Sequence, residues 1–426
     1  MRVCFIGHQG TKEGAGFFML DQIDYLRQHG VTVFAILPGD GALADALTER
    51  QIEFAIVPND WWIKPHWLGR DEDHGRAILA ARKMADLFRR WAIDVVYTET
   101  SVAPAGAFAA AFAGLPHIWH MHEFAYNPTA IEMAMPRESW ARVIDLTSNY
   151  VFFNSRAVAA DWSGLFSADK TRVVYNWTSL TFDDVTIDTS DSVARALLSD
   201  ENTFVATIVA SIHPLKRQID AIQAVGNLLR EKLDVALLVV GPVVDRAYQK
   251  TLTDLVEQNH WENRVRFLGY SDHPHRVMRD SDVMLVCSSS EAFGRVTIES
   301  MAQGTPVIGS DCGGTPEIID AGIDGLLFPL GDVSALTDKL RTLVADKPLR
   351  QRLSDASRKK AHRFQGAESS MPPVLETLEA LVGTKNPSWP VGSVVGSGLD
   401  GGILSQQRAR TIVNRARRVV RKLLGR

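Results

Sequence analysis

One stretch of the sequence, residues 288–331, restricts the possible folds more than any other. The apolar run 283–287 before it is short enough to be a single buried strand, and the periodic run 296–303 predicts a helix. A further strand starts at Thr305, and Gly304 is expected in the left-handed conformation that closes a helix. A strand, loop, helix and strand in this order predict a doubly wound α/β sheet, in which ligands bind beyond the carboxyl ends of the strands.

The same stretch contains groups that suit a nucleotide sugar. Glu291 lies in the first loop, and Glu299 lies eight positions later on the predicted helix. Carboxylates at these two places can accept hydrogen bonds from the hydroxyls of a sugar and of a ribose. The alternative interpretation is two solvated carboxylates on an ordinary helix.

A glycine turn follows the second strand of this stretch. Gly313 and Gly314 lead to Thr315, which we expect to cap a helix whose first residue is Pro316. The backbone N–H groups of such a turn and of the helix start can bind phosphate.

The alternation of strand and helix patterns continues along most of the chain. Strand-like runs occupy 3–6, 31–37, 54–57, 94–97, 150–154, 173–175, 204–210, 235–240 and 265–268. Helical patterns occupy 42–51, 77–91, 103–113, 218–230, 247–258, two parts of 333–361, and 364–382. The polar segment around 183–192 marks a change of domain.

Composition limits the class of protein. The length of 426 residues suggests two or three domains. The last nineteen residues carry eight Lys and Arg and no acid, which leaves 38 basic and 50 acidic residues elsewhere. A body this acidic does not fit a nucleic-acid binder. The cysteines Cys4, Cys287 and Cys312 lie far apart, which favours reduced thiols in a cytosolic protein over a disulfide framework.

The sequence also bears on targeting. The first strand is too short for the apolar region of a signal peptide, and no apolar run approaches the roughly 20 residues of a membrane span. We therefore expect a cytoplasmic protein. The basic end, 403–426, repeats apolar residues at helical spacing and predicts an amphipathic helix. Such a helix can lie on the anionic inner face of a membrane, while a solvated or partner-bound tail remains an equal alternative.

Glycines also follow the first strand. Gly14-Ala15-Gly16 is followed by Phe17, Phe18 and Met19, so the dinucleotide fingerprint G-x-G-x-x-G is not met. This disfavours a nicotinamide oxidoreductase. The glycines can equally be ordinary turn residues.

The words EAFGRVTIESMAQGTPVI, GGTPEII and DGLLF resemble glycosyltransferase family 4, whose retaining members carry two glutamates separated by seven residues. The resemblance covers roughly 1–382 and is strongest in 283–331. It implies the GT-B architecture, an α/β fold with two Rossmann-like doubly wound domains facing across a cleft. The implied divisions are an acceptor-side domain at 1–182, a nucleotide-sugar domain at 183–363, a helix returning to the first domain at 364–382, a linker at 383–402 and the tail at 403–426.

The resemblance also implies roles for particular residues. Glu299 would bind the ribose, Glu291 the donor sugar, and Lys216 the leaving diphosphate. The remaining implied contacts to the donor are Ser211, Gly14, Gly16, Phe293, Gly294, Arg295, Gly313, Gly314 and Thr315. No separate cofactor and no metal are implied, since the nucleoside-diphosphate sugar is itself the donor substrate.

One part of the family pattern is absent. The loop after strand 204–210 commonly carries Gly-Arg, and here Ala210-Ser211 stands in that place. Lys216 is present. Arg217 could supply the missing charge only if the loop bends differently, so the contacts to the diphosphate stay open.

Three histidines lie close together at His117, His120 and His122. At strand period, His120 and His122 share a face while His117 points to the other, and no cysteine is near, which disfavours a metal site. In the family a histidine at the end of this strand reaches the donor sugar. His122 fits that position best, with His120 as the alternative.

The acceptor is expected near Gly14, Gly16, His122 and the aromatic segment Trp61–Trp67, although a loop packed onto the domain explains that segment equally well. Together these features predict a retaining glycosyltransferase acting on a glycan or lipid-linked acceptor in bacterial cell-surface polysaccharide synthesis. Two alternatives are a sugar-nucleotide epimerase on the same fold and a nucleotide-sugar-binding protein without activity.

The sequence Asp280-Ser281-Asp282 resembles an Asp-x-Asp metal-binding motif of another glycosyltransferase fold. We interpret it here as structural.

Overall fold

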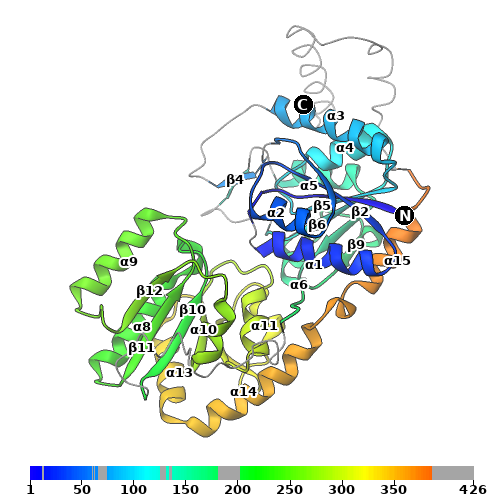
Figure 1. The fold of residues 1–426 in the computed structure, drawn as a ribbon. Coiled ribbons are helices and arrows are strands. Elements are labelled where there is room, and N and C mark those ends of the chain that lie inside the picture. The colour runs from blue at the N-terminus through cyan, green and yellow to red at the C-terminus, as the bar shows by residue number, and fades with distance from the viewer. Residues whose placement is uncertain are drawn as a thin grey trace. The chain divides into compact units, whose positions relative to one another are not determined.

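The computed structural model describes residues 1–11, 14–59, 61, 63–65, 74–124, 131–133, 137–180 and 202–385 (Figure 1). The chain divides into two compact units, which we describe separately. The first contains Met1–Asn154, Val158–Val174 and the described residues from Met371 on, and the second contains Ser155–Ala157 and Tyr175–Ser370.

The first unit is built on a seven-stranded sheet with the order β3-β2-β1-β5-β6-β8-β9. All its strand pairs are parallel. The strands are β1 (Arg2–Ile6), β2 (Thr32–Leu37), β3 (Glu53–Ile56), β5 (Val95–Glu99), β6 (His117–Met121), β8 (Tyr150–Phe153) and β9 (Thr171–Val173). A separate antiparallel ribbon joins β4 (Ile63–Pro65) to β7 (Ile131–Met133).

The central strands of this sheet are buried along almost their whole length, as expected of parallel strands covered on both faces, and β5 and β6 include the buried polar residues Glu99, His117 and His120. Helix α3 packs beside α4 (Figure 1). The helices in this part of the chain are α1 (Gly14–Gln28), α2 (Ala42–Glu49), α3 (His74–Trp91), α4 (Ala105–Ala113), α5 (Arg137–Thr147), α6 (Arg156–Asp161) and the short η2 (Ala168–Lys170). Near the chain end, α15 (Pro372–Leu381) follows Met371 and belongs to the first unit.

The second unit is built on a six-stranded parallel sheet with the order β12-β11-β10-β13-β14-β15. Its strands are β10 (Phe204–Val209), β11 (Val235–Val240), β12 (Val265–Gly269), β13 (Val283–Val286), β14 (Val307–Ser310) and β15 (Gly325–Phe328). The order grows outward from β10 in both directions, so the crossover between β10 and β13 is the point where ligands bind in doubly wound sheets.

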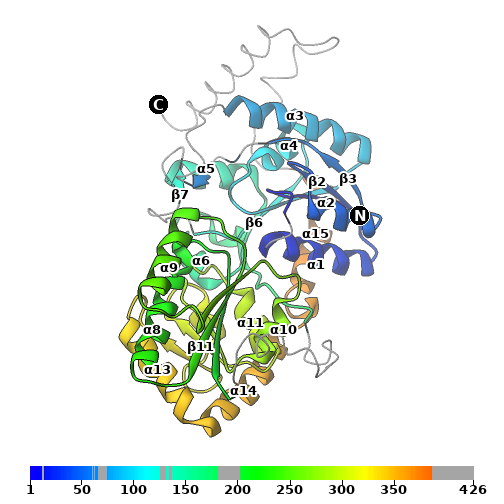
Figure 2. The same cartoon turned by 60° about the vertical axis from the view of Figure 1, so that its left-hand side comes forward.

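Helices cover both faces of this second sheet. Helix α8 packs beside α13, and α11 packs beside α14 (Figure 2). The helices are η3 (Pro214–Lys216), α8 (Gln218–Arg230), α9 (Arg246–Gln258), α10 (Pro274–Asp280), α11 (Arg295–Ala302), α12 (Thr315–Ile318), α13 (Val333–Ala345), α14 (Lys347–Ala361), η4 (His362–Phe364) and η5 (Ala367–Ser369). Apolar side chains of β10, β11 and α8 form the larger core cluster.

Several local predictions are confirmed. Helix α8 and strand β11 have the predicted bounds. Gly304 has φ 78° directly after Gln303, the C-cap of α11, as expected for a left-handed helix end. Asp282 accepts a hydrogen bond from the backbone N–H of Val205 (2.9 Å), which is a structural use of that carboxylate.

Three predictions of element bounds are wrong. A single helix over 364–382 is replaced by two short 3₁₀ turns and α15, because Gly366 has φ 72° and Pro372-Pro373 fits only the first turn of a helix. Gly314, not Thr315, is the N-cap of α12, so Thr315 is its first residue. The strand predicted at 173–175 lies earlier, at β9.

Other predictions fall outside the described residues. They concern the polar segment 183–192, Trp62, His66, Trp67, and the linker and tail from 386 on. Among the helices of the described part, none combines the length and the apolar character that crossing a bilayer requires.

Candidate functional site

Three neighbouring strands of the second unit carry the predicted donor residues beyond their carboxyl ends. Lys216 follows β10, Glu291 follows β13, and Gly313 follows β14. Because the strands are parallel and adjacent, the loops that follow them meet at one edge of the sheet. The predicted residues are therefore neighbours although the sequence separates them widely.

Lys216 and Glu291 contact each other directly. The Lys216 Nζ lies 2.8 Å from Glu291 Oε2, and the two side chains are 28% and 13% exposed. The pair places one fixed positive and one fixed negative charge side by side, partly shielded from water. A ligand that carries both anionic phosphate and neutral hydroxyls can use both groups.

The glycine turn packs against the backbone of the Glu291 loop. The Gly314 N–H donates to the Glu291 carbonyl (2.7 Å). A Cβ at Gly313 would lie 2.3 Å from that same carbonyl oxygen, and one at Gly314 would lie 2.5 Å from the Ala292 carbonyl. Gly313 also has φ 59°. Only glycine allows the backbone of the turn to come this close to the backbone of the Glu291 loop. The two segments are therefore packed directly against each other.

Gly294 turns the chain from the Glu291 loop into α11. Its φ of 99° makes it a left-handed N-cap. The next residue, Arg295, faces Glu299 one helical turn later, with 3.4 Å between Nε and Oε1. Both predicted glutamates of the second unit are thus next to a cation. The Phe293 side chain, in contrast, is buried between Tyr175 and Phe364, so only its backbone is available to a ligand.

Arg217 does not replace the arginine of the family pattern that is absent at Ser211. Arg217 has φ 48°, and its guanidinium forms a two-point contact with Asp220, at 2.7 Å from Nε and 2.9 Å from Nη2. That contact raises the pKa of Arg217 and pairs its charge with Asp220 on α8.

Two other predicted donor contacts have partners or surroundings of their own. The Ser211 carbonyl accepts a hydrogen bond from the Gln218 side chain (2.9 Å). The Thr315 side chain is buried.

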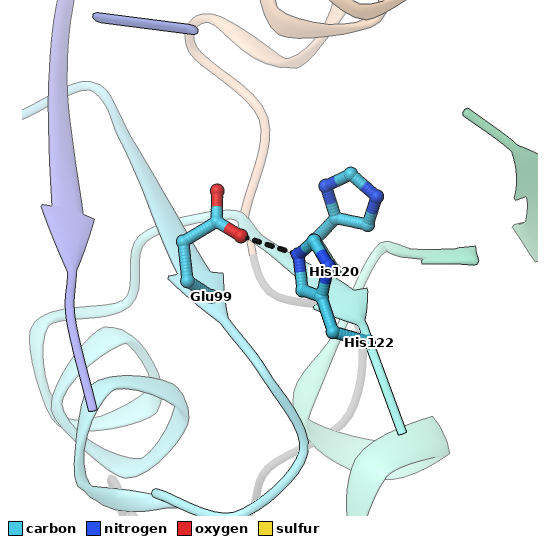
Figure 3. A group of neighbouring side chains, drawn as sticks. All are labelled: Glu99, His120 and His122. Carbon is cyan, nitrogen blue, oxygen red and sulfur yellow. Dashed lines mark hydrogen bonds and ion pairs between the residues drawn. The ribbon is translucent and has the colours of Figure 1, made fainter. Parts of the chain in front are cut away.

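The first unit holds the predicted site histidine, His122, and its alternative, His120, at the carboxyl edge of its own sheet. His122 comes directly after β6, and its Nε2 lies 2.7 Å from Oε2 of Glu99, the last residue of β5 (Figure 3). The side chains are 7% and 1% exposed. The other ring nitrogen, Nδ1, lies 3.4 Å from Nδ2 of Asn154, which follows β8.

The other two histidines differ in their surroundings. His120 and His122 lie with ring centroids 4.5 Å apart, as their shared face predicts. His117 points elsewhere, to the Thr98 hydroxyl (2.8 Å) and the Thr147 carbonyl (3.1 Å), and burial lowers its pKa to about 3. Burial also lowers the pKa of His120, whose Nδ1 faces the Tyr97 hydroxyl at 2.8 Å.

A possible metal group exists here that the sequence did not indicate. Glu99, His120 and His122 each place a ligand atom within 4.8 Å of the others. Zinc ligands bind at about 2.0–2.2 Å from the ion, so an ion would have to separate the Glu99–His122 pair.

Gly14 and Gly16 open α1 and do not form a free loop. They lie in its first turn, where Gly16 is buried. The first turn of a helix is a place where backbone N–H groups can bind an anion. Trp61 donates from Nε1 to the His8 carbonyl (2.7 Å), and the two rings lie 5.5 Å apart. This side chain therefore packs onto the domain, as the structural alternative for the aromatic segment expected.

Sequence reasoning missed Glu99, Gln22 and Asn154. Gln22 on α1 donates from its side-chain amide to Glu99 Oε1. The available signal was a charged residue closing the run Val95–Glu99 after four residues without charge, at a position where parallel strands present their ligands.

Two protein-family models match this chain, one in each half of the sequence. The model of Glycosyltransferase Family 4 matches residues 13–182, and that of Glycosyl transferases group 1 matches residues 190–360. N-acetyl-alpha-D-glucosaminyl L-malate synthase of Bacillus anthracis is 35% identical over 154 residues, which is 36% of this chain and 39% of that protein. D-inositol 3-phosphate glycosyltransferase of Mycolicibacterium smegmatis is 24% identical over 334 residues, which is 77% of this chain and 68% of that protein.

Solved structures share the fold. Anabaena HepE in complex with UDP and glucose superposes with a TM-score of 0.77 at 23% identity, over 89% of this chain and 100% of that one. Sucrose-phosphate synthase from Thermosynechococcus elongatus superposes with a TM-score of 0.71 at 17% identity, over 89% and 99%. With both sheets parallel and one family model matched in each half, the chain has the GT-B fold and belongs to glycosyltransferase family 4.

Proposed function

We propose that this glycosyltransferase moves a sugar from a nucleoside-diphosphate sugar, with retention at the anomeric carbon, to a glycan or lipid-linked acceptor. The observation that carries this proposal is the Lys216–Glu291 pair, with 2.8 Å between the charged atoms. It supplies a cation for the leaving diphosphate next to a carboxylate for the hydroxyls of the donor sugar.

The chemistry follows from charge. When the bond from the anomeric carbon to the diphosphate breaks, negative charge grows on the phosphate oxygens and positive charge grows on the sugar ring. The Lys216 ammonium stabilises the first, and the N–H groups around Gly313 and Gly314 add fixed dipoles. Glu291 orients the sugar, and Glu299 holds the ribose, so that binding energy positions the reacting atoms.

We propose uridine as the base of the donor. The solved HepE complexes contain UDP and UDP-glucose, and their fold matches this chain. These complexes support UDP-glucose as the first donor to test.

The experiment is thermal stabilisation of the full chain by a panel of nucleoside diphosphates and their sugars. At a ligand concentration of 100 Kd, about 2.7 kcal/mol of stabilisation is expected. UDP should stabilise the wild type, and Glu299→Ala should lose most of the shift. The matched control is Glu257→Ala, an exposed glutamate on α9 of the same unit, which should keep the shift.

Three outcomes would contradict the proposal. No shift with any nucleotide would mean that the donor loop, the segment between β13 and α11 that carries Glu291, binds no nucleotide. An equal shift in Glu299→Ala would mean that the ribose binds elsewhere. Turnover of the nucleotide sugar without an acceptor would favour an epimerase.

We further propose that no separate cofactor takes part. The cation next to the diphosphate is a fixed side chain, Lys216, and both ends of the donor have partners in the chain. Transfer should therefore persist after treatment with EDTA and dialysis. Loss of activity that Mg²⁺ or Mn²⁺ restores would overturn this part.

The acceptor side of the proposal depends on the basic end of the sequence. Eight Lys and Arg with no acid in the last nineteen residues suit an anionic membrane surface, where lipid-linked glycans for cell-surface polysaccharides are assembled. Flotation with anionic liposomes should recover the full chain but not a form lacking 403–426. Equal recovery of both forms, or of neither, would refute a membrane role for this segment.

A further inference from the structure

Glu99 is a carboxylate that lies almost entirely inside the first unit. Its side chain is 1% exposed, at the carboxyl end of β5. An ionised carboxylate buried without partners costs several kcal/mol, so its hydrogen bonds define what it does there.

The two oxygens of Glu99 have separate partners. Oε1 accepts from the side-chain amide of Gln22, which is fully buried on α1. Oε2 lies 2.7 Å from His122 Nε2 (Figure 3). An ionised carboxylate only accepts hydrogen bonds, so the proton of this contact is on Nε2 of the histidine.

The opposite ring nitrogen of His122 has different surroundings. The Asn154 amide nitrogen is 3.4 Å from Nδ1, so this side of the ring faces a donor. With Nε2 protonated and a donor group opposite, Nδ1 is the acceptor of the ring.

Burial keeps two neighbouring histidines neutral. Burial lowers the pKa of His8 to about 3, with a further contribution from His122, and burial also lowers the pKa of His120. Glu123 holds the backbone at His122 in place. Its Oε2 accepts a hydrogen bond from the backbone N–H of His122 (3.3 Å) and two from Ser101, from the N–H and the hydroxyl (both 2.9 Å).

The backbone next to Glu99 is strained. Thr100 has φ 72°, a region that β-branched residues rarely adopt. It is fixed by a hydrogen bond from its N–H to the His120 carbonyl (2.8 Å) and by one from Trp119 Nε1 to its carbonyl (2.5 Å). Strain of this kind collects where a site needs a particular geometry.

A metal ion explains the same cluster less well. His120 could ligate through Nε2, which has no hydrogen-bond partner among the described residues, but the Glu99 oxygen and the His122 nitrogen that would join it already bind each other at 2.7 Å. An ion would have to break this contact between Glu99 and His122, and a positioning role needs no such change.

We propose that Glu99 is a positioning residue that holds the His122 imidazole with its proton on Nε2, so that Nδ1 accepts a hydrogen bond from a substrate hydroxyl, which replaces the long contact to Asn154 (3.4 Å). The inference rests on the proposed function for the identity of that hydroxyl, which belongs to the donor sugar or the acceptor. The tautomer itself depends only on the first unit.

The test is ¹⁵N NMR of the full chain labelled at its twelve histidines. The His122 signals are assigned by their loss in His122→Gln. In the wild type, Nε2 should carry the proton and Nδ1 should have the chemical shift of an unprotonated nitrogen. In Glu99→Gln the amide can donate to Nε2, so the proton should move to Nδ1.

Two further variants keep the test decisive if Glu99→Gln does not fold. Gln22→Met removes the support of the other carboxylate oxygen and should give a mixture of tautomers. Asp94→Asn makes the same carboxylate-to-amide change at the opposite end of β5, where Asp94 accepts from the Arg2 N–H (2.7 Å), and should leave His122 unchanged. A wild-type His122 protonated on Nδ1, or one unaffected by both Glu99→Gln and Gln22→Met, would overturn the proposal.

Kinetics separate this proposal from the proposed function. Glu99→Gln should lower kcat by about 10- to 100-fold, the range known for losing the partner that orients a metal-bound histidine, with KM for the donor little changed. If the wild type transfers no sugar, the proposed function fails while the NMR result still decides the tautomer. Addition of Zn²⁺ that shifts the His120 and His122 signals together at stoichiometric concentration would overturn the positioning role in favour of a metal site.

Discussion

The ammonium of Lys216 lies 2.8 Å from the Glu291 carboxylate, although 75 positions separate the two residues in the sequence. Each group is the partner that compensates the other for partial loss of water. A diphosphate sugar would replace this mutual contact with two new ones, a phosphate on Lys216 and hydroxyls on Glu291. The pair therefore holds two opposite charges side by side, as the proposed function requires.

The first prediction concerns Lys216→Met. If Lys216 binds the leaving diphosphate as proposed, removing its ammonium leaves that group without its cation and Glu291 without its partner. A hydrogen bond to a charged group contributes about 1.5–3 kcal/mol, so kcat/KM should fall by roughly 10- to 100-fold. Steady-state kinetics with UDP-glucose measures it. The control is Lys250→Met, which breaks an exposed Lys–Asp pair on α9 and should leave kcat/KM within error.

The second prediction concerns the ribose. If Glu299 accepts from a ribose hydroxyl, 2′-deoxy-UDP should bind the wild type about 1–3 kcal/mol more weakly than UDP. In Glu299→Ala the two nucleotides should bind almost equally, because the hydroxyl has already lost its partner. Isothermal titration of all four combinations gives the coupling energy. Additive effects would mean that Glu299 acts on another part of the donor.

The third prediction concerns the glycine turn. In Gly313→Ala the new Cβ would lie 2.3 Å from the Glu291 carbonyl oxygen at a φ of 59°, so the turn must move and carry the donor loop with it. UDP binding should be lost and the Tm should fall. Gly322→Ala is the control, since Gly322 has φ 81° but nothing within 4 Å of the new atom. It should show only the backbone strain, of about 1–2 kcal/mol, with normal UDP binding.

A structural feature can be predicted from the sequence where the residues that determine it lie close together in the chain. The bounds of α8 are predicted because its apolar spacing and its flanking residues all lie within the segment. The left-handed Gly304 after α11 is predicted for the same reason. The 364–382 helix is wrong although the residues that interrupt it are also local, because Gly366 with φ 72° and Pro372-Pro373 stop the helix that the apolar spacing favours.

The Glu99 pair could not be predicted from any local pattern. Its partners Gln22 and His122 are 77 and 23 positions away, and only the order of strands β1, β5 and β6 brings them together. The commitment of Arg217 to Asp220, in contrast, is a contact three positions apart that the spacing alone could have suggested.

The fourth prediction concerns Thr100. Its φ of 72° costs a β-branched residue about 1–2 kcal/mol, and its buried hydroxyl has no hydrogen-bond partner among the described residues. Thr100→Gly removes both penalties, whereas Thr100→Ala removes only the second. The glycine variant should therefore unfold at a higher urea concentration than the alanine variant. The opposite order would mean that Thr100 is not strained.

The last prediction is acid sensitivity of the first unit. The pKa of His117 is about 3 in the folded chain because burial opposes its charge, against about 6.5 in an unfolded chain. The unfolded state therefore binds one more proton between these two values, and stability falls as the pH drops through that window. The loss is about 1.4 kcal/mol per pH unit, or roughly 2 kcal/mol between pH 6.5 and pH 5 for His117 alone.

Urea unfolding at pH 7 and pH 5 measures this loss. His117→Gln keeps a hydrogen-bond donor for the Thr147 carbonyl but cannot take up the proton. Because burial lowers the pKa of His120 as well, the variant should still lose stability at pH 5, but by about 2 kcal/mol less than the wild type. An equal loss in both proteins would mean that His117 is protonated in the folded state, with its bond to the Thr98 hydroxyl made by an N–H of the ring.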